Sequence, residues 1–103
     1  MISEEKRQLG FAFSNRFERE IQTKTISVAG SPVQFSFSST KTGYTPLMFT
    51  VYFGQSTTTL GGVETSTLSG NSFSASGYLK ETDSSTRSVS ITCRVLWVST
   101  EDV

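Results

Sequence analysis

The fold class of this chain is decided by one stretch, Ser88-Val89-Ser90-Ile91-Thr92-Cys93-Arg94-Val95-Leu96-Trp97-Val98. From Val89 to Trp97 every second side chain is apolar, which is the period of a β-strand with one buried face. Leu96 and Val98 also make the end of the stretch apolar on its other face. We therefore expect a long strand whose inward side chains, Cys93 among them, pack in the core as small and large hydrophobic groups.

Shorter stretches upstream alternate in the same way and predict further strands. They cover residues 25–28, 33–38, 47–53, 63–68 and 73–79, with Gly, Ser, Thr and Pro between them. Gly70-Asn71 is a tight hairpin signal, and no segment of this region suits the crossover helix that parallel strands need. We predict an all-β fold, an antiparallel, jelly-roll-like β-sandwich of roughly six or seven strands with a short N-terminal arm.

Residues 47–53 are apolar on both faces of the expected strand. Leu47, Phe49, Val51 and Phe53 share one face, and Met48 and Tyr52 lie on the other. A strand of this kind usually lies in the interior and is covered on both sides. Because another sheet or another subunit can supply the second cover, Met48 and Tyr52 are candidate subunit-interface residues.

The first 23 residues form the predicted arm, which is charged and aromatic. Leu9, Phe13, Phe17 and Ile21 recur every four residues, as on one face of a helix, while the alternation around Phe11 and Phe13 also suits an extended chain. Both conformations stay open. Three Phe on a short charged segment need cover from the β domain or from a neighbouring subunit. Phe11, Phe13 and Phe17 are therefore candidate interface residues, with residues 24–98 as the β-sandwich domain and 99–103 as a polar tail.

Composition excludes several classes of partner and cofactor. Nine basic residues balance nine acidic ones, so the chain lacks the positive field that nucleic-acid binding requires. It has no histidine and one cysteine, which excludes a zinc site and a disulfide framework. No stretch approaches the ~20 apolar residues of a membrane span, and the start lacks the apolar region of a secretory signal. We predict no nucleic-acid partner, no membrane contact, no metal and no cofactor.

Few residues suggest catalysis, and the chain is predicted not to be an enzyme. Hydroxyl groups are abundant, but no histidine can activate one of them. Glu81 and Asp83 share a polar loop and offer paired carboxylates or calcium ligands, although solvated or capping roles are favoured for both. Tyr78 lies on a polar strand face and Tyr44 in a loop, which makes them candidate glycan contacts.

Three segments together resemble a known β module. They are Thr25-Ile26-Ser27-Val28-Ala29-Gly30, then Gly43-Tyr44-Thr45-Pro46-Leu47, and the final alternating stretch from Ser88 to Val98. This module recurs at the ends of bacteriophage and prophage tail-fibre and minor structural proteins. The resemblance implies a virion structural protein: a trimeric β-sandwich, exposed on the particle, that contacts host-surface glycans and carries no catalytic residues.

Fibre tips usually end a long chain, whereas Met1 leads us to expect that this chain is a small protein with its own start. A capsid decoration protein or head-fibre subunit is therefore an alternative, with the N-terminal arm docked on another virion protein. A carbohydrate-binding module outside a virus is the third reading. In the first two readings the protein is located in the virion and works by attachment, as a homo-oligomer.

Overall fold

The computed structural model describes residues 16–54 and 57–100, and six strands account for nearly all of them. They are β1 (Phe17–Val28), β2 (Val33–Thr40), β3 (Tyr44–Gly54), β4 (Thr59–Ser69), β5 (Ser72–Glu81) and β6 (Arg87–Ser99). Every pairing between them is antiparallel, so the all-β prediction is confirmed. β4 begins at Thr59, earlier than the stretch 63–68 from which the sequence predicted this strand.

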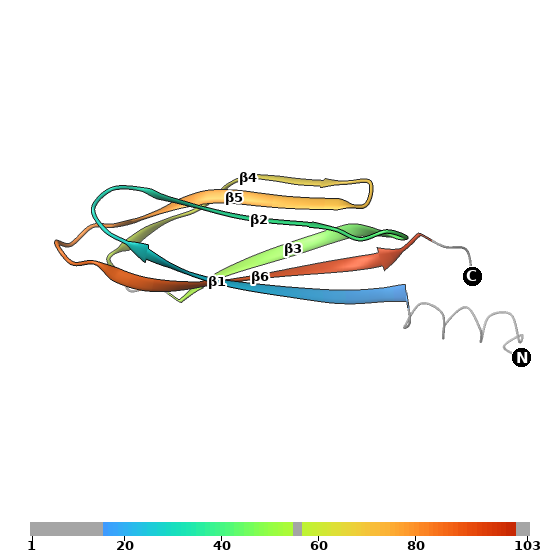
Figure 1. The fold of residues 1–103 in the computed structure, drawn as a ribbon, viewed down its shortest axis with the longest axis horizontal. Coiled ribbons are helices and arrows are strands. Elements are labelled where there is room, and N and C mark those ends of the chain that lie inside the picture. Colours follow the sequence, from blue (N-terminus) through green and yellow to red (C-terminus); the bar gives the residue numbers. More distant parts are fainter. Residues whose placement is uncertain (1–15, 55–56, 101–103) are drawn as a thin grey trace, which may run out of the picture.

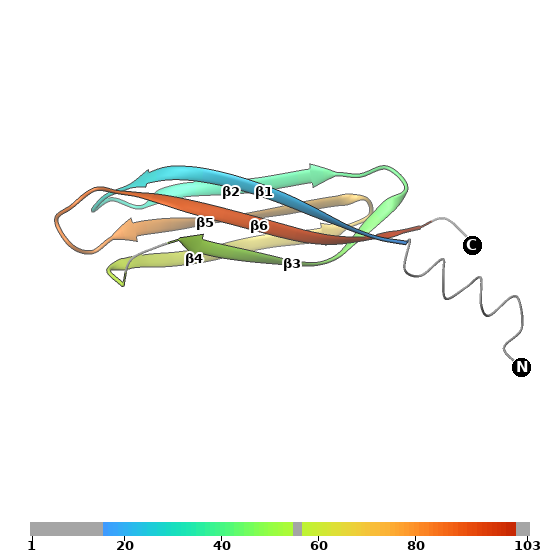
Figure 2. The ribbon, with the colours of Figure 1, turned by 90° about the horizontal axis from the view of Figure 1, so that it is seen from below.

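The strands form two three-stranded sheets, which we call sheet I (β1-β6-β3) and sheet II (β2-β5-β4). Figures 1 and 2 show the strands running along the length of an elongated body, with sheet I on one side and sheet II on the other. β1 starts and β6 finishes at the same end, which we call the near end. The turn after β1 and the loop between β5 and β6 lie at the opposite, distal end (Figure 1). An eight-stranded jelly roll has two strands more than this arrangement.

The core lies between the two sheets. Sheet I contributes the inward side chains of β6 with Val28, and sheet II contributes Phe35, Phe37, Phe73, Ala75 and Leu79. Aromatic rings of the two sheets contact each other: the ring centroids of Phe35 and Phe53 are 5.4 Å apart, and those of Phe73 and Phe49 are 5.1 Å apart. The alternation that predicted β6 is confirmed, because Val89, Ile91, Cys93, Val95 and Trp97 are all buried. Burial also raises the pKa of the Cys93 thiol.

The first strand begins earlier than the sequence indicated. Phe17 pairs with Val98, and the register continues without a break to Val28 opposite Arg87. Residues 17–23, placed in the arm by the sequence, are therefore part of sheet I, and the helical alternative does not apply to them. The spacing of four residues was ambiguous because four is also a multiple of the strand period. Residues 1–15, including Phe11 and Phe13, lie outside the described residues.

β3 contains an irregularity that changes which side chains face the core. Its register against β6 shifts between Pro46 and Met48, so Leu47 is the extra residue of a β-bulge. Leu47 is 48% exposed while Pro46 is buried, and the prediction that Leu47 shares a face with Phe49, Val51 and Phe53 is wrong. Beyond the bulge Phe49, Val51 and Phe53 pack against the core as expected.

A polar seam closes one long side of the molecule, where the edge strands β1 and β2 lie next to each other. Glu20 accepts hydrogen bonds from the Trp97 indole (3.0 Å) and from the Ser39 hydroxyl (2.9 Å). Gln22 donates to the Ser38 carbonyl at 3.2 Å, and Lys24 donates to the Ser36 carbonyl. At the near end Lys41 pairs with Glu18 at 2.7 Å, which raises the pKa of the Lys41 ammonium. The seam joins the two sheets by side chains because no strand bridges them there.

Candidate functional site

The strongest candidate site is the outer surface of sheet I, which turns away from the core. Side chains directly opposite one another in antiparallel strands point to the same side, so the register with β6 identifies this surface. We call its apolar members the apolar face: Phe17, Ile21, Met48, Tyr52, Leu96 and Val98. Ile21 and Met48 are each 55% exposed and Tyr52 is 65% exposed. Monomeric proteins rarely leave such a cluster uncovered.

The apolar face brings together three of the predicted interface residues. Phe17 comes from β1, whereas Met48 and Tyr52 come from β3, and β6 lies between these strands. The core does not need these side chains, because the inner side of β3 is already covered by sheet II. The second cover that the sequence predicted for β3 is thus absent within the described part of the chain.

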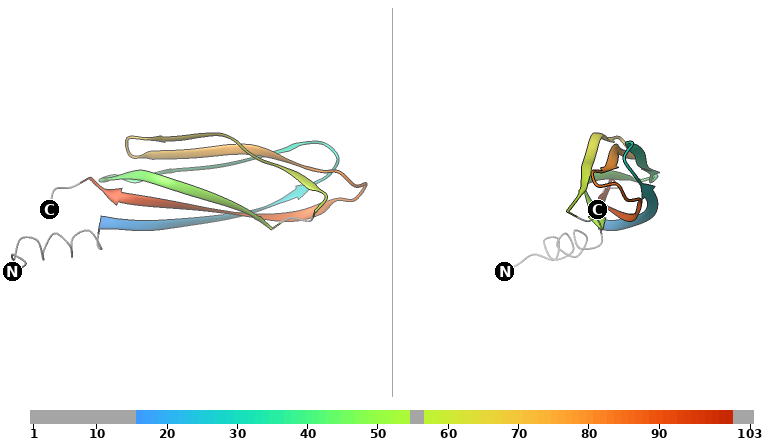
Figure 3. Two further views of the ribbon diagram at one scale, coloured as in Figure 1. Left: turned by 180° about the vertical axis from the view of Figure 1, so that it is seen from behind. Right: turned by 90° about the vertical axis from the view of Figure 1, so that its left-hand side faces the viewer.

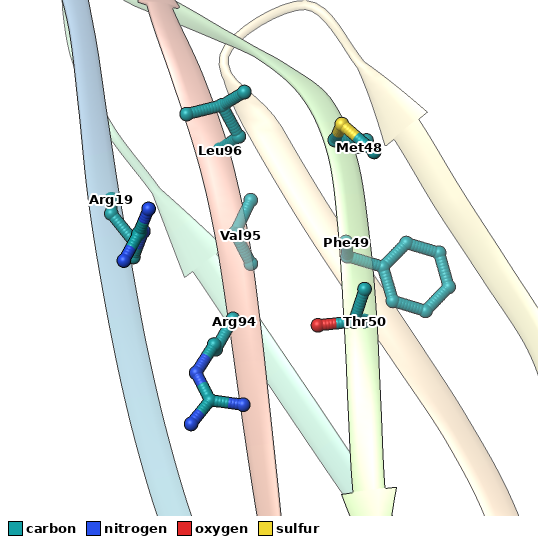
Figure 4. A pocket seen from close by; sticks show the side chains of 7 residues that line it. All are labelled: Arg19, Met48, Phe49, Thr50, Arg94, Val95 and Leu96. Carbon is teal, nitrogen blue, oxygen red and sulfur yellow. The ribbon is translucent and has the colours of Figure 1, made fainter.

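A groove of about 370 Å³ runs across the same surface. Figure 4 shows its lining: Arg19 from β1, Arg94, Val95 and Leu96 from β6, and Met48, Phe49 and Thr50 from β3. The register explains the arrangement, since Arg19, Leu96 and Met48 form one row across the sheet. Ile21, Arg94 and Thr50 form the next row, so each row places one arginine beside apolar groups.

Arg19 and Arg94 give this surface a positive character. Neither guanidinium forms an ion pair with the described residues. The described residues on the outer side of sheet I include no carboxylate, because Glu18 and Glu20 point toward the seam. A ligand for this surface should therefore be apolar and carry negative charge opposite the two arginines. The sequence pattern located Met48 and Tyr52, but only the strand register places the arginines among them.

The outer surface of sheet II has a different character, and we call it the hydroxyl face. Its register places three serine or threonine side chains in each of three successive rows across β2, β5 and β4. The rows are Thr40, Ser72 and Ser69, then Ser38, Ser74 and Thr67, then Ser36, Ser76 and Thr65. Hydrogen bonds within this surface join Thr65 to Ser76 at 2.9 Å and Thr40 to Ser72 at 3.3 Å. Hydroxyls that water can solvate need no further cover.

The two tyrosines predicted as glycan contacts lie in different sheets. Tyr78 is in β5, 42% exposed, on the outer side of sheet II. Tyr44 is the first residue of β3 rather than a loop residue, and its ring packs against the core. The Lys41 ammonium lies 5.0 Å from the centroid of that ring. The two side chains therefore do not form one aromatic platform.

The paired carboxylates at the distal end are bound to an arginine. Arg87 contacts Glu81 at 2.9 Å and Asp83 at 2.6 Å, and the Thr59 hydroxyl donates to Glu81 at 2.9 Å. Hydrogen bonds from Ser85, together with Arg87, hold the pKa of Asp83 well below its usual range. Hydrogen bonds from threonine hydroxyls lower the pKa of Glu81 although the side chain is buried. These groups brace the loop between β5 and β6, and neither carboxylate is poised as a general acid.

Residues 16–54 and 57–100 contain neither a cluster of metal-ligating side chains nor a helix that could cross a membrane. Comparison of the chain with models of protein families, with curated proteins and with solved structures gives no match.

Proposed function

We propose that this protein is a non-catalytic structural component of a virion, of the tail-fibre or receptor-binding type, that works by attachment. The observation that carries the proposal is the apolar face on the outer side of sheet I. Docking would remove Ile21, Met48 and Phe17 from water, and fully burying a side chain of this size contributes roughly 1.5–3 kcal/mol. The arginines in the same rows favour a partner surface that bears carboxylates.

The contrast between the faces gives the proposed orientation on the particle. The apolar face contacts another virion protein, and the hydroxyl face stays in water. Tyr78, on the hydroxyl side, is then the better placed of the two candidate glycan contacts. The same geometry suits a capsid decoration or head-fibre protein, for which binding to the particle is the whole function.

The test asks whether the chain binds particles through the apolar face. Tagged protein is expressed in cells that produce the particles, which are then purified and assayed for the chain. Phe17→Glu with Ile21→Glu should lower the bound amount at least tenfold, because two charges replace the apolar groups of β1. The matched control is Ser36→Glu with Thr40→Glu, which has the same spacing on the edge strand β2 of the hydroxyl face.

The expected result is that the control binds as the natural chain does. Equal binding by the variant in β1 would exclude the apolar face as the docking surface. A chain that never copurifies with particles would overturn the assignment to a virion.

A further inference from the structure

Two three-stranded sheets leave four edge strands, and three of them are protected against pairing with another chain. β1 carries Glu18, Arg19, Glu20 and Lys24, and charged side chains are a common protection of sheet edges. In β2 the carbonyl groups of Ser36 and Ser38 accept hydrogen bonds from the seam. Part of the backbone on that edge is therefore already bound.

β4 is protected by its irregular backbone. Its register against β5 shifts between Val63 and Thr65, and the residue in the bulge is the charged Glu64. Gly61 lies nearby with a φ of 133°, in the region that L side chains rarely adopt. A bulge bends the edge strand, and a charged side chain there disfavours pairing with a second strand.

The edge of β3 lacks all of these protections from Met48 to Gly54. This segment contains no charged residue and no proline, and its register against β6 is regular. No other described segment makes a hydrogen bond to the free side of its backbone. A long, uncharged and apolar edge of this kind is a template for antiparallel pairing.

We infer that the partner of this edge is a second copy of the chain, paired antiparallel with β3 about a two-fold axis at Val51. Val51 is the middle residue of the regular segment 48–54, so this register pairs every residue of it. An axis perpendicular to sheet I makes one continuous six-stranded sheet and keeps both apolar faces on the same side.

The side chains of β3 are complementary to themselves in this register. Phe49 lies opposite Phe53 of the second copy on the inner side, and Val51 lies opposite its own equivalent. Thr50 lies opposite Tyr52 on the outer side. Cross-strand aromatic and β-branched pairs stabilise antiparallel strands, whereas like charges opposite one another destabilise them. β3 brings no charge to the pairing, so nothing of that kind opposes it.

The inference goes beyond the proposed function because it uses a different surface. Pairing through β3 leaves Phe17 and Ile21 of both copies exposed, since β6 separates β1 from β3. The dimer would present two apolar faces side by side to the particle. It also replaces the trimer implied by the resemblance with a two-fold assembly.

The test is the dissociation constant of the dimer, measured by analytical ultracentrifugation of the full chain over a range of concentrations. Thr50→Lys with Tyr52→Lys places like charges opposite each other twice and should weaken the dimer at least tenfold. Thr50→Lys with Tyr52→Glu places opposite charges in the same two pairs and should keep the dissociation constant within about threefold. Thr67→Lys with Ser69→Lys, at the same spacing on the hydroxyl face of β4, is the matched control and should change nothing.

Each other outcome counts against the inference. A natural chain that stays monomeric at the highest concentration overturns it, and so does a mass of three chains. Equal weakening by the two β3 variants overturns the register at Val51.

Circular dichroism checks that each variant is folded, and hydrogen exchange of the natural chain provides a measurement without substitutions. The amides of β3 should exchange more slowly as concentration rises. A monomer that still binds particles refutes only the dimer, and a dimer that binds none refutes only the proposed function.

Discussion

The outer faces of sheets I and II differ although the same strand period builds both. In sheet I the outward positions near the place where β1 starts hold Phe17, Ile21 and Met48. In sheet II the corresponding surface is a set of nine hydroxyls. Water can solvate the hydroxyls of sheet II, whereas on sheet I it contacts apolar groups. One side of the molecule is therefore suited to water, whereas the other holds exposed apolar groups that a contact would cover.

The two long sides of the molecule differ in a similar way. Figure 3 shows the molecule from behind and along its length, with β1 and β2 on one side and β3 and β4 on the other. The seam of Glu20, Gln22 and Lys24 joins the first pair of edges. On the other side Val63 and Leu68 of β4 remain partly exposed beside the unprotected edge of β3. Polar side chains link β1 to β2 on the first side, whereas the edge of β3 on the other side is the one that we infer binds a second copy.

The largest loss of stability is expected from a substitution at Gly77, in the middle of sheet II. A methyl group on Gly77 would lie 1.9 Å from the carbonyl oxygen of Gly62 in the neighbouring strand. Gly77→Ala should therefore force β4 and β5 apart and lower the free energy of unfolding by about 2–4 kcal/mol. Urea denaturation measures the loss, and the disturbed sheet should expose its inner side to the dye ANS.

The control for this prediction is Gly30→Ala, in the turn between β1 and β2. No atom lies within 4 Å of the methyl group that this change adds. The free energy of unfolding should stay the same or rise by about 0.4–1 kcal/mol, because alanine restricts the unfolded chain. A loss at Gly30 as large as that at Gly77 would contradict the explanation by a backbone clash.

Acid should act on the distal end, which holds the carboxylates of Glu81 and Asp83, whereas the described residues on the outer side of sheet I include no carboxylate. The folded pKa values of Glu81 and Asp83 lie below the ordinary 4.5 and 3.8. A lowered folded pKa contributes stability that is fully present above the ordinary value and is lost as pH falls through the folded one. The free energy of unfolding should therefore decrease as the pH falls below about 4.

Urea denaturation at neutral pH and at about pH 3 measures this decrease. In Asp83→Asn the decrease should be smaller, because one of the two linked protonations is removed. Asp83→Asn should also be less stable than the natural chain at neutral pH, since Arg87 loses a charged partner. An unchanged dependence on pH in this variant would show that other carboxylates account for the acid sensitivity.

The smallest expected effect on stability comes from exchanging the characters of the two faces. Ile21→Thr with Met48→Thr makes the apolar face polar, and Thr67→Val with Ser74→Val adds apolar groups to a cross-strand pair of the hydroxyl face. Each change should alter the free energy of unfolding by less than about 0.5 kcal/mol per site, as surface substitutions generally do. Hydrophobic-interaction chromatography should show weaker retention of the first variant and stronger retention of the second. A change in the same direction in both variants would contradict the assignment of the outer side of sheet I as apolar and that of sheet II as polar.

Much of the fold could be predicted from alternation alone. β6 with its inward side chains, and strands over residues 33–38 and 73–79, appear where the sequence placed them, because a strand with one buried face leaves a period of two residues. The hairpin at Gly70-Asn71 is also confirmed, with Gly70 at a positive φ of 57°. A glycine in the first central position is what a type II′ turn requires.

Other parts of the fold could not be predicted, for identifiable reasons. A β-bulge at Leu47 reverses the assignment of one side chain. Pro46 beside it is compatible with a bulge, but the alternation of apolar residues does not locate one. The first part of β1, residues 17–24, was not predicted as a strand because its inward positions carry Glu20, Gln22 and Lys24 instead of apolar residues. Those side chains satisfy partners in β2 and Trp97, and such partners lie far away in the sequence.

The candidate site was predicted in part. The apolar character of Met48 and Tyr52 on the second face of β3 was visible in the sequence, as was the need to cover it. Ile21 and Arg94 could not be assigned to the same surface before the pairing of β1, β6 and β3 was known. Tyr44 and Tyr78 were selected as a pair by residue type, and the structure separates them.

By itself the sequence determined the all-β class, the inward residues of β6 and the double apolar character of residues 47–53, because these follow from local periodicity. Only the tertiary structure decided which strands are edges, which edge is unprotected, and which side chains share the apolar face. Those properties depend on pairing between strands far apart in the chain. Pairing is fixed by the packing of both sheets on one core, which no single stretch of sequence encodes.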